Sequence, residues 1–209
     1  MQTDDYFTKE IYKEMYEYEE RLEKMLRAMA ESIIAADKKI VVDIQTTGND
    51  YKRDEIIKIS IIDIDNNILY DSFLKPERKF NQDLKLISQQ TGIDPELIAN
   101  APPLSVQAYN INKILFSANT IIGYSLGKSM RFLANAGCSW RTDYDFISIE
   151  DAFTLADNIN SENAALDDCA AYFGYNWNNG SSHDTLENCR AILYCYNKML
   201  ETGGELFPI

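Results

Sequence analysis

The chain reads IVVDIQTTG at residues 40–48 and DEIIKISIID at residues 54–63. Both stretches are rich in β-branched residues, and the second intersperses isoleucine with polar residues, a pattern typical of β-strands. A third strand is predicted at residues 67–74, because the run Asp65-Asn66-Asn67 before it favours a tight turn. Three strands joined by short connections predict an antiparallel meander at the start of a globular domain.

The rest of the chain alternates between helical and strand patterns. Two short apolar runs, at residues 120–124 and 146–149, predict further strands. Apolar residues recur at helical spacing in six segments, which are residues 83–90, 103–116, 129–135, 151–158, 162–173 and 183–201. A meander followed by alternating helices and strands predicts an α/β fold, in which helices cover both faces of a mixed five-stranded sheet.

Composition limits the classes of function. The chain has 209 residues, 45% of them hydrophobic, and no apolar stretch approaches twenty residues, so we expect a soluble protein with one sizeable core and no membrane partner. A net charge of −13 repels phosphate backbones and argues against tight nonspecific binding of nucleic acid, although it permits a local basic groove. Residues 1–10 are polar and acidic, unlike a secretory signal, so we expect a cytoplasmic location. No CxxC pair is present, which predicts reduced, buried thiols at Cys138, Cys169, Cys189 and Cys195.

Residues 1–37 differ from the globular domain predicted at residues 38–209. Between Tyr6 and Ala36 there is no Pro or Gly, and apolar residues recur mostly at steps of three and four. This pattern predicts an amphipathic helical extension. Three roles stay open for its apolar stripe: packing on its own domain, self-association as a coiled coil, or binding of a protein partner.

Three segments resemble the motifs of one enzyme family. Residues 43–48, Asp-Ile-Gln-Thr-Thr-Gly, are similar to the first motif of the DnaQ-like (DEDDh) 3′-to-5′ exonucleases, Asp-x-Glu-Thr-Thr-Gly. Residues 121–125 and 130–133 resemble the second motif, with Ser129 at its Asp position. Residues 183–189 resemble the third motif, His-x-Ala-Leu-x-Asp, with Asn188 at its Asp position. The three motifs occur in order and at family spacing, and the resemblance covers residues 39–200.

The resemblance implies a ribonuclease H-like fold and a known chemistry. In this family four carboxylates hold two divalent cations, and a histidine acts as general base. Asp43 and His183 remain here as catalytic remnants, and Asp43 is the one expected metal ligand. Lost carboxylates are replaced at Gln45, Ser129 and Asn188.

One anionic ligand does not neutralise two adjacent divalent cations. We therefore expect no cofactor, or at most one weakly bound Mg²⁺ or Mn²⁺. Asp184 lies one helical turn before Asn188 and is a possible substitute ligand, although a surface position is favoured for it.

These losses predict a catalytically impaired or inactive exonuclease-fold protein, a pseudo-exonuclease. Its expected ligands are a single-stranded nucleic-acid end, a nucleotide or a protein partner, and the resemblance implies that Thr46, Thr47 and Gly48 contact a nucleotide. One alternative is an active, metal-dependent 3′-to-5′ exonuclease of the DNA polymerase III epsilon-like type with reduced activity. The other is an interaction module that acts through the N-terminal helix.

Overall fold

The computed structural model describes Glu20 and residues 38–78, 83–156, 164–177 and 184–201. By its contacts the chain divides into two units, Met1–Asp37 and Lys38–Ile209. Apart from Glu20, the predicted N-terminal helix lies outside the described residues, so its role stays a prediction.

In the described part of the second unit, five strands form one sheet in the order β3-β2-β1-β4-β5. Strand β1 pairs antiparallel with β2, and β2 pairs antiparallel with β3, whereas β1–β4 and β4–β5 are parallel pairs. The mixed sheet, an antiparallel meander continued by parallel strands, is therefore confirmed. The strands are β1 (Lys39–Thr46), β2 (Ile56–Asp63), β3 (Ile68–Phe73), β4 (Thr120–Gly123) and β5 (Asp145–Ser148).

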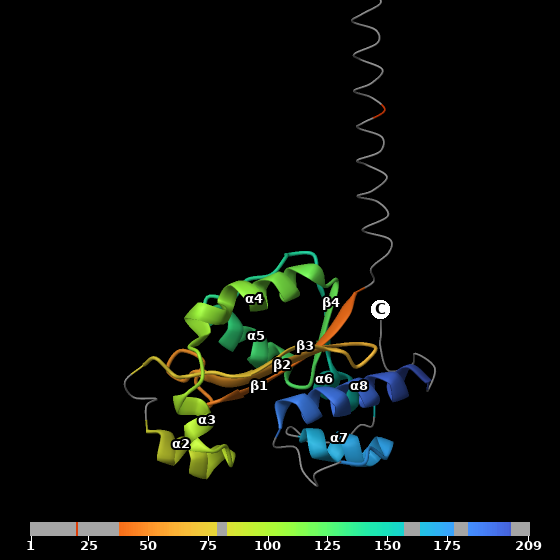
Figure 1. Cartoon of the computed structure of the whole chain (residues 1–209). Helices are drawn as coiled ribbons and strands as arrows, with labels where there is room; N and C mark the ends of the chain where they lie inside the picture. Colours follow the sequence, from red (N-terminus) through yellow and green to blue (C-terminus); the bar gives the residue numbers. More distant parts are fainter. Residues whose placement is uncertain (1–19, 21–37, 79–82, 157–163, 178–183, 202–209) are drawn as a thin grey trace, which may run out of the picture. The chain divides into compact units, whose positions relative to one another are not determined.

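Helices cover both faces of this sheet (Figure 1). Helices α4 and α5 lie on one face, and α7 and α8 lie on the other. The helices are α2 (Leu84–Thr91), α3 (Pro95–Ala99), α4 (Leu104–Ser117), α5 (Leu126–Asn135), α6 (Ile149–Ala156), α7 (Leu166–Phe173) and α8 (Thr185–Glu201). Among the described residues, no helix is both long enough and apolar enough to span a membrane.

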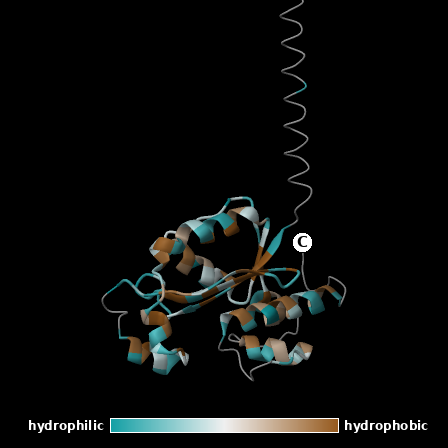
Figure 2. Ribbon diagram, viewed as in Figure 1, coloured by the Kyte–Doolittle hydropathy of each residue, from teal (hydrophilic) through white to brown (hydrophobic). Residues whose placement is uncertain are grey.

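Alternation along β1 divides the core into two layers. Val41 packs in the cluster that includes α7 and α8, whereas Ile40 and Val42 pack in the cluster that includes α4 and α5. The strands are accordingly coloured mainly as hydrophobic where helices cover them (Figure 2). Because side chains alternate along a strand, Asp43 and Gln45 share the face of Val41, toward α8. The four cysteines are buried and unpaired, as predicted.

Three helices differ from the sequence prediction. Helix α7 begins at Leu166, although a helix was predicted from residue 162, because Ala165 before it has an extended backbone conformation. Helix α5 begins at Leu126, three residues before the predicted start, although Gly127 lies in its first turn. The short helix α3 was not predicted, yet it has a recognisable start, since the Asp94 side chain accepts a hydrogen bond from the Glu96 amide and Pro95 is the first helical residue.

Candidate functional site

The candidate site lies where β1 and β2 face the start of α8. In the antiparallel β1–β2 pair, Asp43 is opposite Ser60 and Gln45 is opposite Lys58. Opposed residues project to the same face, so all four side chains point toward α8. The sheet register thus places a lysine beside two of the positions at which the family motif has carboxylates.

Asp43 is held by the amide of Asn188. The Asn188 Nδ2 group donates a hydrogen bond of 2.9 Å to Asp43 Oδ2. Burial of the carboxyl group raises the pKa of Asp43 to about 6, and the hydrogen bond from Asn188 offsets only part of this effect. The negative charge of Asp184 raises the pKa further, whereas the positive charge of Lys128 lowers it. Asp43 therefore holds its proton more tightly than an ordinary aspartate.

Two amide oxygens in this region are buried and have no hydrogen-bond partner among the described residues. They are Gln45 Oε1 and Asn188 Oδ1. Each amide uses its N–H group instead, because Gln45 Nε2 donates to the Thr91 carbonyl at 3.3 Å and Asn188 donates to Asp43. An unsatisfied buried acceptor costs free energy. The two amides therefore have the shape of the carboxylates of the family motif, but their oxygens accept no hydrogen bond from the described residues.

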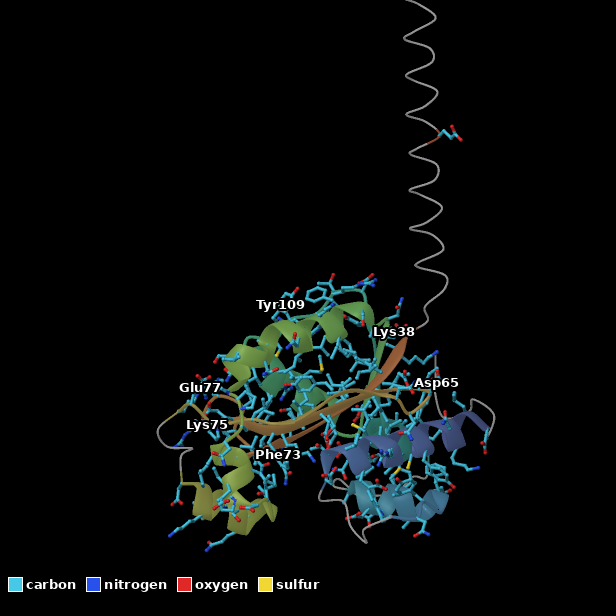
Figure 3. The ribbon with its side chains drawn as sticks, in the orientation of Figure 1. Lys38, Asp65, Phe73, Lys75, Glu77 and Tyr109 are labelled. Atoms are coloured by element: carbon cyan, nitrogen blue, oxygen red, sulfur yellow. The ribbon has the colours of Figure 1, made fainter. Side chains whose placement is uncertain are left out.

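Lys58 is a buried cation at the centre of a polar network. Its side chain is 5% exposed, and its ammonium group donates to Asp184 and lies 4.0 Å from Asp71. The Ser60 hydroxyl donates to Asp71 at 2.7 Å and lies 2.6 Å from the Thr185 hydroxyl. Phe73, labelled in Figure 3, places its ring 4.9 Å from the ammonium nitrogen. A buried ammonium needs such partners, since its desolvation is otherwise costly.

Asp184 has a structural role at the start of α8. Its Oδ1 accepts hydrogen bonds from the backbone amides of Leu186 and Glu187, at 2.8 and 3.2 Å, as an N-cap residue does. Burial alone would raise the pKa of Asp184, but the hydrogen bond and charge of Lys58 bring it below the usual value. The side chain is 49% exposed, which agrees with the predicted surface position. Both of its oxygens nevertheless accept hydrogen bonds, from Lys58 and from the start of α8.

Glu187 is turned away from the sheet face. It is buried, accepts a hydrogen bond of 2.7 Å from the Tyr175 hydroxyl, and pairs with Arg190 at 3.2 Å. Neither Asp184 nor Glu187 is therefore free to replace a missing metal ligand.

The loop after β1 is held by its own hydrogen bonds. The Thr46 hydroxyl donates to the Gly48 carbonyl at 2.6 Å, and the Thr47 hydroxyl accepts from the Glu55 amide at 3.0 Å. A Cβ atom on Gly48 would lie 2.4 Å from Asp54 Oδ2, an atom that also accepts the Asp50 amide at 2.8 Å. The close approach favours glycine at this position, because any other residue would force the Asp54 side chain to move.

Replacing Gly48 by Ala is expected to lower the free energy of unfolding by about 1 kcal/mol, because Asp54 must move and lose its hydrogen bond to Asp50. Urea unfolding followed by circular dichroism measures the change. Gly127→Ala is the matched control, since a Cβ atom there meets nothing within 4 Å. Equal stability of the two variants would contradict the prediction.

The donor set does not fit a pair of divalent cations. Asp43 is the one carboxylate among the three motif positions brought together at the β1–α8 face, its pKa is raised, and one of its oxygens already accepts an N–H group. Magnesium prefers hard anionic oxygens, which amides do not provide. Among the described residues, no group of three His, Cys, Asp or Glu side chains is suited to hold a metal ion. Ser129 is buried on α5, and His183 lies outside the described residues.

The fold is that of the ribonuclease H-like exonucleases, and the chain's structural neighbours are DnaQ-like exonucleases. Exonuclease I from Methylocaldum szegediense matches with a TM-score of 0.61 and 18% identity, over 81% of this chain and 41% of that chain. E. coli exonuclease I, in a zinc-bound form complexed with single-stranded DNA, matches with a TM-score of 0.64 and 15% identity, over 81% and 42%.

Exonuclease X, bound to duplex DNA with a 5′ overhang, matches with a TM-score of 0.58 and 13% identity over 79% of this chain and 93% of its own. The chain thus spans about two fifths of the exonuclease I chains that it matches. Neither the protein-family models nor the curated protein sequences give a match. At these identities the likeness establishes the fold.

Proposed function

We propose that this chain is an exonuclease-fold protein that binds the end of a single-stranded nucleic acid, or a nucleotide, without cutting it. The observation that supports this best is the state of Asp43, the carboxylate kept from the family motif. An amide occupies one of its oxygens and burial raises its pKa to about 6. A single carboxylate with one oxygen already engaged cannot neutralise two adjacent divalent cations. At most one Mg²⁺ or Mn²⁺ ion binds, weakly, at Asp43.

The ligand-binding half of the proposal rests on the intact loop after β1. A cavity of about 360 Å³ lies beside this loop and is lined by Thr47, Arg53, Leu86 and Ile87, among others. Its lining combines one cationic side chain and apolar surface with the carboxylates of Asp50, Asp54 and Asp83, which repel a phosphate group but can accept hydrogen bonds from a sugar or a base. Exonuclease I and exonuclease X, which share the fold, are known in complexes with DNA. We place the terminal nucleotide in this cavity, next to Thr46, Thr47 and Gly48.

A nuclease assay tests the proposal. End-labelled single-stranded DNA and RNA are incubated with the full chain in Mg²⁺ or Mn²⁺, beside the variant Gln45→Glu/Ser129→Asp/Asn188→Asp. We expect no shortening by the native protein, because the two-metal geometry is lost. Calorimetry should show at most one weak Mn²⁺ site in the native chain and tighter binding in the triple variant. Manganese-dependent trimming by the native protein, abolished by Asp43→Ala, would establish the reduced-activity exonuclease instead.

A further inference from the structure

A second cavity, of about 400 Å³, shares no lining residue with the first. It lies between the β1–β2 loop, the first turns of α5, and the junction of β5 with α6. The loop contributes Asn49 and Tyr51, α5 contributes Lys128 and Arg131, and the junction contributes Glu150. Arg131 lies within the segment that resembles the second family motif, whereas the other four side chains lie outside the motifs.

The α5 wall of this cavity carries two cations. Lys128 and Arg131 are both exposed and lie three residues apart, so they share one face of the helix. The Lys128 ammonium donates one hydrogen bond, of 2.7 Å, to Asn49 Oδ1 across the cavity rim, which leaves two N–H donors for a ligand. Its charge also reaches Asp43, where it lowers the pKa. The cationic wall is therefore close to the candidate site.

The start of α5 adds partial positive charge to the same wall. Ser125 occupies the N-cap position, but its hydroxyl donates to Glu150 Oε2 at 2.7 Å and does not cap the helix. Gly127, in the first turn, lines the cavity, and a Cβ atom there would meet nothing within 4 Å. The backbone is thus open to an approaching anion, which a helix start and two cations attract together.

The opposite wall of the cavity is acidic and limits the chemistry of the rest of the ligand. Glu150 and Asp151 line it, and their charges repel a ligand that is anionic throughout. They can accept hydrogen bonds from sugar hydroxyls or base amino groups. Tyr51, which is partly buried, offers an aromatic ring on which a base can stack. These features together suit one phosphate joined to a hydroxylated, aromatic body.

We infer that this second cavity binds the phosphate group of a further nucleotide, free or at the other end of the strand whose terminal nucleotide lies in the first cavity, through Lys128 and Arg131 and without a metal ion. The inference rests on the proposed function. It assigns to Lys128 and Arg131 the positive charge that divalent cations supply to the phosphate in the family that the motifs resemble. It predicts a weak, salt-dependent interaction. Because neutralising one phosphate of a single strand gives a slope of about 0.7, affinity should fall about two- to threefold when salt rises fourfold.

The test uses the full chain in EDTA with a fluorescein-labelled pentathymidylate that carries a 5′-phosphate, followed by anisotropy. We expect Lys128→Met/Arg131→Gln to weaken binding at least tenfold. Lys113→Met/Arg141→Gln, which removes the same charge from exposed side chains that do not line the cavity, should weaken it less than twofold. Thermal melting confirms that both variants are folded.

Competitors distinguish the sources of the phosphate. Displacement of the probe by thymidine monophosphate indicates a free-nucleotide site, whereas displacement by oligonucleotides alone indicates a strand-end site. Equal loss in the two double variants, or no measurable binding by the native chain, would overturn the inference. Equal loss would overturn this site alone, since the native chain would still bind the probe, whereas absence of binding would also overturn the binding half of the proposed function. Neither result bears on cleavage, which the nuclease assay decides separately.

Discussion

Replacing Asp43 by Asn should stabilise the protein at pH 7, by about 1–2 kcal/mol. Burial raises the pKa of Asp43 from its ordinary value of 3.8 to about 6, so ionisation at neutral pH works against the folded state. The full linkage value would be about 3 kcal/mol, which we reduce because the residue keeps partial solvent exposure. Asparagine keeps the shape and can accept the Asn188 amide through its own oxygen.

The pH dependence gives this prediction its sign. Because the pKa is raised in the folded state, the stability contributed by the bound proton is fully present below pH 3.8 and is lost as pH rises through 6. The advantage of Asp43→Asn should therefore be largest above pH 7 and vanish near pH 4. Urea unfolding of both proteins at pH 4.5, 6 and 7.5 measures it. A variant that is less stable than the native chain at pH 7.5 would contradict the prediction, because it would show that the ionised Asp43 carboxylate stabilises the folded state.

Replacing Asp184 by Asn should cost about 2–3 kcal/mol of stability, because Lys58 would stay buried with its nearest counter-ion removed. Asparagine still caps a helix, so the loss isolates the charge. The cost falls below that of a fully buried pair, since Asp71 remains 4.0 Å away and Asp184 is half exposed.

The double variant Lys58→Met/Asp184→Asn should recover to within about 1 kcal/mol of the native chain, because methionine fills the same space beside Phe73 without a charge. Asp143→Asn, which breaks the exposed pair with Arg141, is the matched control and should change little. Equal stability of the Asp184 single variant and the double variant would show that the loss does not come from the buried charge of Lys58.

These expectations describe an internal polar network at the motif positions. The lysine ammonium of β2 links the sheet to the start of α8 through Asp184. Two buried amide oxygens beside it, Gln45 Oε1 and Asn188 Oδ1, accept no hydrogen bond from the described residues. The network also accounts for the strand position of Lys58, which is otherwise unusual in a run of buried isoleucines.

Part of this site was readable from sequence. The motif order located Asp43 and Asn188, and the structure brings them to 2.9 Å across 145 residues of chain. Lys58 was missed, although a lysine inside an isoleucine-rich strand was a usable signal. The cations of α5 were not singled out from the sequence. The predicted helix began at Ser129, after Lys128, whereas α5 begins at Leu126 and places Lys128 and Arg131 on one helix.

The sequence by itself determined the strands of the antiparallel meander and the positions of the motif residues, because strand periodicity and motif spacing are local properties of the chain. The order of the five strands, β3-β2-β1-β4-β5, was decided by tertiary pairing. Tertiary structure alone decided where each polar side chain turns. Gln45 faces Thr91, Asp184 faces Lys58, and Glu187 faces Tyr175. These choices depend on which donors and acceptors packing brings within 3–4 Å, and residues far apart in sequence supply them.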